Sequence, residues 1–168
     1  MSKKIHRYVC DFPELFVTLC HIINQNFIIM SITEQHELKE KYYREATRYM
    51  DNAKEYLKSA QKEGNIYRDP KYVRTACGTA YSGVLIALDG YFILKGIHTS
   101  NSRKVRKSID YYQQNLAKQD KKMLDNLNLA YKILHLSGYY DGIESVNVIK
   151  EGFSYANAII EKIKPLSH

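Results

Sequence analysis

The sequence predicts an all-α protein, built as an antiparallel bundle of four to five helices. Small side chains recur between residues 69 and 96 at spacings of four and three, along one side of a helix: Ala76, Ala80, Gly83, Ala87 and Gly90. Glycine weakens a helix interior by about 1 kcal/mol relative to alanine, so its recurrence indicates that another backbone passes close by. Other segments repeat apolar residues with the same helical period, and none alternates for long enough to predict a strand.

The composition fits one soluble domain. Its 168 residues can enclose a core without disulfides or a structural metal. Hydrophobic residues make up 45% and charged residues 26% of the chain, and no apolar run fills the roughly 18 positions that a membrane span requires. The three cysteines lack metal-ligand spacing, and the N-terminus does not read as a secretory leader. We therefore expect a cytoplasmic protein with no metal and no cofactor.

Two interpretations fit residues 1–30, which precede the predicted bundle domain of residues 31–165. One is a short additional helix with an apolar face formed by Leu15, Phe16, Leu19, Ile22, Ile23 and Phe27. The other is that Met30 is the true start, because Ser31 to Glu34 form a capping box that would begin the first helix of the bundle. The intact mass of protein from its native host distinguishes the two.

Residues 34–63 are predicted to form the first long helix of the bundle. Large and small residues alternate along one face: Tyr42, Ala46, Tyr49, Ala53, Tyr56 and Ala60. Gly64 and Asn65 supply the stop. We expect the tyrosine rings to fill the core against the small face of the next helix, with their hydroxyls at its rim.

The second helix is predicted over residues 69–96, with Asp69 as N-cap, Pro70 at the first position and Gly96 at the end. Two amphipathic helices follow, one from about Arg103 and one from about Asp120. Their predicted core residues are Val105, Ile109, Tyr112 and Leu116 in the first, and Met123, Leu127, Ala130 and Leu134 in the second.

A loop over residues 137–142 is predicted to break the fourth helix and to offer Asp141 as the cap of the last helix, which ends near Lys164. Gly152 and Ala156 form a notch in that helix, which we expect to meet residues 80–87. Its predicted buried residues are Ile143, Val146, Ile149, Phe153, Ile160 and Ile163.

Residues 34–96 carry a further pattern, formed by Ala53, Leu57, Ala60, Gly64 and Tyr67, then Ala80-Tyr81, Ala87-Leu88 and Gly96. In these residues the chain resembles the HEPN superfamily, small helical bundles named as nucleotide-binding domains of higher eukaryotes and prokaryotes. The resemblance implies a bundle that commonly dimerises. In that superfamily some members are ribonucleases and others are accessory or substrate-binding partners of a nucleotidyltransferase.

The ribonuclease members carry an arginine, four to six intervening residues and a histidine near the start of the last core helix. None of the six histidines of this chain follows an arginine at that spacing. The resemblance therefore does not carry ribonuclease activity to this protein.

Asp89 is the first candidate site residue, because it lies on an apolar side of the second helix, where a lone carboxylate is costly. A functional interpretation makes it a buried acid facing a pocket with Arg74 or His135. The structural interpretation, which we favour, has it satisfied by tyrosine hydroxyls or a lysine.

His135, Tyr139, Tyr140 and Asp141 form the densest polar and aromatic cluster, at a helix junction. They either line a ligand pocket or partner surface, or cap a helix with two tyrosines folded over the bundle end. The second interpretation is the commoner one.

Residues 95–122 hold eight basic residues against two acidic ones, which gives +6 of the total +7. The candidate phosphate contacts are Arg103, Lys104, Arg106 and Lys107. Tyr111 and Tyr112 lie among them, and tyrosines beside basic residues suit single-stranded nucleic acid. A solvated, lysine-rich connection is the simpler interpretation.

Together these observations predict a non-catalytic helical bundle that serves as a protein-interaction or accessory module. We expect it to form a homodimer or to bind another protein, such as a nucleotidyltransferase. No catalytic residue, metal ligand or cofactor site is predicted. The alternative is a binder of nucleic acid or nucleotides that uses residues 95–122.

Overall fold

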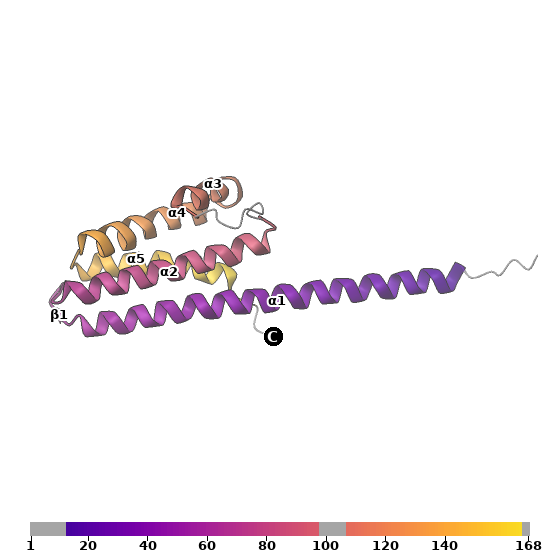
Figure 1. Ribbon diagram of the computed structural model, residues 1–168, viewed down its shortest axis with the longest axis horizontal. Coiled ribbons are helices and arrows are strands. Elements are labelled where there is room, and N and C mark those ends of the chain that lie inside the picture. Colours follow the sequence, from indigo (N-terminus) through magenta and orange to yellow (C-terminus); the bar gives the residue numbers. More distant parts are fainter. Residues whose placement is uncertain (1–12, 98–106, 166–168) are drawn as a thin grey trace, which may run out of the picture. The chain divides into compact units, whose positions relative to one another are not determined.

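The computed structural model describes the backbone of residues 13–97 and 107–165, and the side chains of residues 33–97 and 107–165. Over those residues the protein is all-α, with five α-helices and one pair of two-residue strands, so the predicted fold class is confirmed (Figure 1). The chain divides into two compact units, residues 1–35 and residues 36–168, and the bundle belongs to the second.

Helix α1 runs without interruption over Pro13–Ser59. The first long helix, predicted over residues 34–63, therefore begins before residue 34, and the capping box of residues 31–34 does not mark its start. That Met30 is the true start of the protein stays a prediction. Residues 14–59 contain no glycine or proline, and a serine in a helix interior costs less than about 1 kcal/mol, so nothing ends the helix there. The apolar face predicted for residues 15–27 lies outside the described side chains.

A short hairpin joins α1 to the next helix. Its strands β1 (Lys62–Glu63) and β2 (Ile66–Tyr67) pair antiparallel, and two residues per strand are too few to give an alternating sequence pattern. Helix α1 ends at Ser59, a turn earlier than predicted. It ends there because the chain returns on itself: the carbonyl of Ala60 accepts a hydrogen bond from the amide of Arg68 at 3.1 Å.

Helix α2 spans Pro70–Leu94, and the carboxylate of Asp69 caps it by accepting a hydrogen bond from the amide of Lys71 at 2.9 Å. The small face of α2 packs against α1, as predicted. A Cβ built on Gly83 would lie 3.1 Å from the carbonyl oxygen of Ala46. One built on Gly90 would lie 2.6 Å from Cβ of Tyr42, so the two helices nearly touch backbone to backbone.

The tyrosines of α1 do not fill the core as predicted. Tyr42 and Tyr49 are half-buried, and Tyr56 is 40% exposed. The buried residues of this part of α1 are small or flexible instead: Ala46, Met50 and Ala53. The close approach to α2 explains the difference, because it leaves no space for a ring between the helices.

Helix α2 is long and apolar enough to cross a membrane by length and composition, although the sequence analysis expected no such stretch. Half of its most apolar window is buried inside the bundle. Burial on several sides gives the core helix of a soluble protein the same composition.

Helices α3 (Ile109–Gln119) and α4 (Lys121–Ala130) follow. Helix α4 begins next to Asp120, as predicted, and the carboxylate of Asp120 caps it by accepting a hydrogen bond from the amide of Met123 at 2.9 Å. The start predicted near Arg103 is wrong, because α3 begins at Ile109, where the hydroxyl of Ser108 accepts a hydrogen bond from the amide of Tyr111 at 3.4 Å. The predicted core residue Val105 lies outside the described residues. The predicted core residues of the fourth helix are all buried: Met123, Leu127, Ala130 and Leu134.

The fourth helix does not break at residue 137. It continues from α4 directly into the π-helix η1, which spans Tyr131–Asp141 and ends only at Gly142, with φ of 74°. The loop predicted over residues 137–142 is therefore wrong for all but its last residue. Contacts with α2, described below, hold this segment in its helical form.

Helix α5 spans Val146–Ile160 and continues as a 3₁₀ turn over Glu161–Ile163. Asp141 does not cap it, contrary to the prediction. The cap is Asn65 of the distant hairpin, whose backbone carbonyl accepts from the amide of Val146 at 2.9 Å and whose side-chain Oδ1 accepts from the amide of Asn147 at 3.2 Å.

The notch in α5 also faces a different neighbour from the one predicted. A Cβ on Gly152 would lie 2.6 Å from Cγ2 of Ile133 and 2.8 Å from Cδ2 of Leu134, both in η1. Helix α5 also packs on α2, but the atoms nearest to Gly152 belong to η1. The predicted apolar face of α5 is buried apart from Ile143, which precedes the helix and is half-buried.

Candidate functional site

The candidate site lies where η1 packs on the first half of α2. At the C-terminal end of η1, the amides of Gly142 and Ile143 both donate hydrogen bonds to the carbonyl of Ser137. The distance from the nitrogen of Ile143 to this oxygen is 2.8 Å. Turns of π-helix are rare, and they occur frequently at functional sites. This segment of π-helix is therefore the candidate functional site.

Arg74 of α2 holds the last carbonyls of η1. Its NH1 donates to the carbonyl oxygens of Tyr139, at 2.8 Å, and Tyr140, and its NH2 donates to that of Asp141 at 3.0 Å. These carbonyls lie at a helix end, where a cation also complements the helix dipole. A Cβ on residue 142 would lie 2.6 Å from Cζ of Arg74, so Gly142 leaves the space that the guanidinium occupies.

One turn after Arg74 on α2, two close contacts join α2 to η1. A Cβ on Gly138 would lie 2.5 Å from Sγ of Cys77, and one on Gly78 would lie 3.1 Å from the ring of Tyr139. Burial raises the pKa of the Cys77 thiol to about 12, so the sulfur stays protonated and unreactive near neutral pH. The site is therefore packed tightly.

Aromatic rings stack along one side of η1. The centroid of His135 lies 5.2 Å from that of Tyr131 and 5.9 Å from that of Tyr139, with the rings nearly parallel in both pairs. Tyr81 of α2 adds a ring at 4.8 Å from His135, and Tyr140 meets His135 edge-on at 5.1 Å. Burial lowers the pKa of His135, which favours a neutral imidazole at pH 7.

The outward side of η1 is apolar and aromatic. Leu136 is 38% exposed, Tyr139 45% and Tyr140 61%, and we call these three residues the aromatic face. Two exposed charged residues stand at opposite ends of η1, Lys132 near its start and Asp141 at its last position.

The structure brings five of the predicted site residues together: Arg74, His135, Tyr139, Tyr140 and Asp141. Asp141 takes part through its carbonyl oxygen. Tyr81 and Tyr131 were not predicted as part of the cluster. The spacing of four between Tyr131, His135 and Tyr139 could have indicated the first of them.

Asp89 does not belong to this cluster. Its Oδ1 accepts a hydrogen bond from the hydroxyl of Tyr112 at 2.9 Å and lies 2.8 Å from Nζ of Lys107. Burial, and then the neighbouring carboxylate, raises the pKa of Tyr112. The contacts are those of the structural interpretation, a tyrosine and a lysine, and the pocket with Arg74 or His135 is not formed.

The basic segment is described only in part. Arg103, Lys104 and Arg106 lie outside the described residues, and Lys107 is paired with Asp89. The ring of Tyr112 is buried against Phe92 at 5.8 Å, so it is not available to stack on a base.

The surroundings of His135 are aromatic. Its ring contacts those of Tyr81, Tyr131, Tyr139 and Tyr140. Across the same residues, no three side chains of His, Cys, Asp or Glu gather closely enough to hold a metal ion. The arrangement instead displays exposed rings on a firmly held support.

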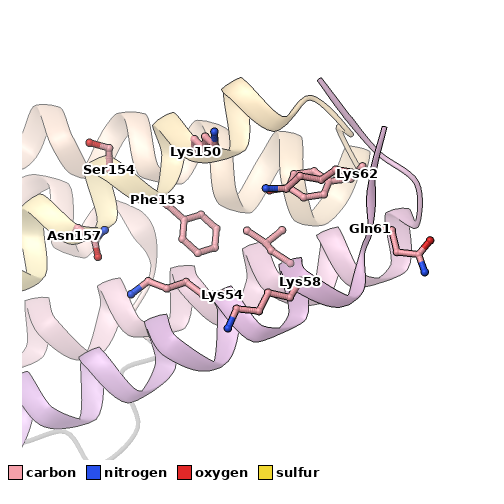
Figure 2. A pocket seen from close by; sticks show the side chains of 10 residues that line it. Lys54, Lys58, Gln61, Lys62, Lys150, Phe153, Ser154 and Asn157 are labelled. Atoms are coloured by element: carbon pink, nitrogen blue, oxygen red, sulfur yellow. The ribbon is translucent and has the colours of Figure 1, made fainter. Parts of the chain in front are cut away.

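A pocket between α1 and α5, which was not predicted, is a further feature of the bundle (Figure 2). Lysines surround an apolar floor that includes Tyr67 and Phe153. The lining residues come from two stretches of the sequence, 54–67 and 150–157, and only the folded bundle brings these stretches together. Lys54 and Lys58, one turn apart on α1, are the part of the pattern that the sequence could have indicated.

Comparison with solved structures finds a protein of unknown function from Dyadobacter fermentans. The two chains are 44% identical and superpose with a TM-score of 0.66, over 74% of this chain and 94% of the other. None of the curated proteins compared matches the chain.

A family model also matches residues 41–165, which include α2, η1, α5 and the hairpin that caps α5. The model is that of a domain of unknown function, DUF5618. The match extends over most of the chain and includes every residue of the candidate site. The protein is therefore a member of the DUF5618 family.

Proposed function

We propose that this protein is a non-catalytic helical bundle of the HEPN type that associates with a second copy of itself through the aromatic face of η1. The observation that carries the proposal is the exposure of Tyr139 and Tyr140 on a helix end that Arg74 holds in place. Tyrosine is enriched at protein interfaces because its large ring also carries a polar group.

The firm support of the rings favours association. Tyr139 rests on α2 at Gly78 and stacks on His135, so its ring has few alternative positions in the free protein. Ordering a mobile side chain at an interface costs about 0.5–1.5 kcal/mol, and rings that are already held avoid most of that cost.

The charges at the ends of η1 favour a second copy of the same chain as the partner. Contacts such as His135 on Tyr131 and Tyr139 show that residues four apart align along η1. Lys132, Leu136 and Tyr140 have the same spacing and form the adjacent stripe, with Asp141 at its end. Two antiparallel copies of η1, related by a two-fold axis, would place Lys132 of each beside Asp141 of the other.

The non-catalytic part of the proposal rests on the chemistry of the residues. The arginine and histidine pair of the HEPN ribonucleases has no counterpart at the required spacing in this sequence. Arg74, the arginine of the candidate site, already donates to three carbonyls.

Sedimentation equilibrium across micromolar concentrations tests the proposal. We expect a dimer for the wild-type protein and a folded monomer for Tyr139→Ser/Tyr140→Ser. The matched control is Tyr56→Ser/Tyr72→Ser, which removes two tyrosines of 40% and 36% exposure on other helices and should leave the dimer intact.

A charge exchange tests the antiparallel arrangement separately. Lys132→Glu should weaken the dimer by placing two acidic residues together at each end, and Lys132→Glu/Asp141→Lys should restore it. A wild-type protein that stays monomeric over the whole range contradicts the proposal, as does a dimer that survives loss of both tyrosines. A failed restoration contradicts the antiparallel arrangement alone.

A further inference from the structure

The pocket between the end of α1 and α5 has an apolar floor. Its volume is about 700 Å³, within the range of about 300–1,000 Å³ typical of small-molecule sites. Leu57 of α1, Tyr67 of β2 and Phe153 of α5 supply the apolar surface, and Figure 2 shows the ring of Phe153 directed into the space between the two helices. Tyr67 and Phe153 are themselves buried, at 2% and 7% exposure, so the floor is a fixed part of the core.

Four lysines line the same pocket, from three different elements: Lys54 and Lys58 from α1, Lys62 from β1 and Lys150 from α5. No aspartate or glutamate is among the lining residues. The pocket therefore combines an apolar surface with a local excess of positive charge.

The partners of these lysines do not neutralise the pocket. Lys54 and Lys58 each pair with a carboxylate one turn back on α1, at 2.8 Å and 2.6 Å, and all four groups are at least half exposed to solvent. Exposed pairs of this kind contribute about 0–1 kcal/mol, so a ligand can compete for the ammonium groups. The Nζ of Lys62 lies 5.4 Å from the centre of the Tyr67 ring, above the floor.

Uncharged polar groups complete the wall on the α5 side. Ser154 and Asn157 are exposed lining residues three positions apart, on the same side of the helix as Lys150. Figure 2 shows these side chains on α5 opposite Lys54 and Lys58 of α1. A ligand would thus meet hydrogen-bonding groups on one wall and ammonium groups on both.

We propose that this pocket binds a small organic anion with a flat apolar body. The body would rest on Leu57, Tyr67 and Phe153, and the anionic group would lie between the lysines of α1 and Lys150. The pocket lies on other elements than the aromatic face, so this proposal is independent of the proposed dimer.

Fluorescence titration with 1-anilinonaphthalene-8-sulfonate tests the proposal on the full chain. This probe joins an aromatic body to one sulfonate, and its neutral relative N-phenyl-1-naphthylamine lacks the charge. We expect saturable binding of the sulfonate at one site per chain, and binding of the neutral probe at least about tenfold weaker, since one charge-assisted contact corresponds to about that factor.

Two pairs of variants locate the site. Lys58→Gln/Lys150→Gln should weaken sulfonate binding at least about tenfold, whereas Lys71→Gln/Lys118→Gln removes two exposed lysines elsewhere and should leave it unchanged. Asn157→Phe should abolish binding by filling the pocket, and Ala158→Phe, at the neighbouring exposed position outside the pocket lining, should not. Circular dichroism of each variant establishes that it is folded.

Equal binding of the two probes contradicts the charge requirement. Absence of saturable binding, or binding that Lys58→Gln/Lys150→Gln and Asn157→Phe leave unchanged in folded protein, overturns the proposal as a whole. Loss of binding in the Lys71→Gln/Lys118→Gln control has the same consequence, because it would assign the effect to net charge.

Discussion

Replacing Gly138 with alanine places one methyl group in the closest contact of the candidate site. The new Cβ would lie 2.5 Å from Sγ and 2.7 Å from Cβ of Cys77. Because Cβ of Cys77 is attached to the backbone of α2, it cannot turn aside, and η1 must move away from α2. Overpacking of this kind costs about 1–3 kcal/mol, whereas alanine gains at most about 1 kcal/mol of helix propensity. We expect a net loss of about 1–2 kcal/mol in the free energy of unfolding.

Gly78→Ala is the matched control, because it adds the same methyl group on the other side of this contact. Its Cβ would lie 3.1 Å from the ring of Tyr139, a contact that a small displacement of the ring relieves without a change of rotamer. The gain in helix propensity then offsets the crowding. We expect the stability to be unchanged or raised by up to about 1 kcal/mol.

Urea unfolding followed by far-ultraviolet circular dichroism measures both variants. With a slope of about 2 kcal/mol per molar urea, the loss expected for Gly138→Ala lowers the midpoint by roughly 0.5–1 M. Cys77→Ala, added to Gly138→Ala, removes Sγ and should recover part of the loss relative to Cys77→Ala alone. The reasoning is refuted if Gly138→Ala keeps the wild-type midpoint and slope, or if Gly78→Ala loses as much stability as Gly138→Ala.

Three further predictions follow from other contacts. Asn65→Ala should lower the free energy of unfolding by about 1 kcal/mol, because it removes the side-chain cap of α5 at the amide of Asn147. A loss smaller than about 0.3 kcal/mol in urea unfolding contradicts this prediction. Because the pKa of His135 is lowered in the folded protein, the unfolded chain takes up this proton at a higher pH than the folded protein does. The contribution of His135 to stability should therefore be constant above its unfolded pKa of about 6.5 and should be lost as the pH falls below that value. His135→Gln should reduce that loss, and an identical pH dependence in the variant contradicts the assignment. Cys77, with its pKa near 12, should react with a thiol reagent only as fast as the protein unfolds in a Cys10→Ser/Cys20→Ser background, and rapid labelling of native protein would contradict its burial.

The elements predicted correctly are those that depend on nearby residues. Helix α2 begins where Asp69 and Pro70 indicate, and α4 begins at the cap formed by Asp120. The small residues of α2 indicated a close neighbour, and Gly83 and Gly90 do meet α1. Caps and periodic faces involve residues within a few positions of one another, so the sequence displays them directly.

The errors arose where distant residues decide the structure. Ser137 and Gly138 have the composition of a loop, yet they are helical because Arg74, more than sixty positions earlier, holds the carbonyls that follow them. Helix α5 begins where Asn65 of the hairpin caps it, and Asp141, the local candidate, plays no such part. The intrinsic helix propensity of a residue carries no information about contacts with residues so distant in the sequence.

The candidate site was predicted in composition but not in its contacts. The sequence selected Arg74, His135 and Tyr139 for their separate chemistry, and it did not indicate that Arg74 holds the backbone of η1. For Asp89 the favoured structural interpretation agrees with the contacts, which are to Lys107 and Tyr112. The lysine-lined pocket was missed because its walls come from residues 54–67 and 150–157, which are distant in the sequence.

Amide hydrogen exchange of residues 139–143 most directly tests whether Arg74 holds the aromatic face on a formed π-helix. The amides of Gly142 and Ile143 both donate to the carbonyl of Ser137, so they should exchange slowly in the wild-type protein. In Arg74→Met they should exchange much faster while the amides of α2 stay protected, and Arg48→Met, at an exposed arginine of α1, should change neither. Rapid exchange of these two amides in the wild-type protein, or full protection without the guanidinium, would contradict the account.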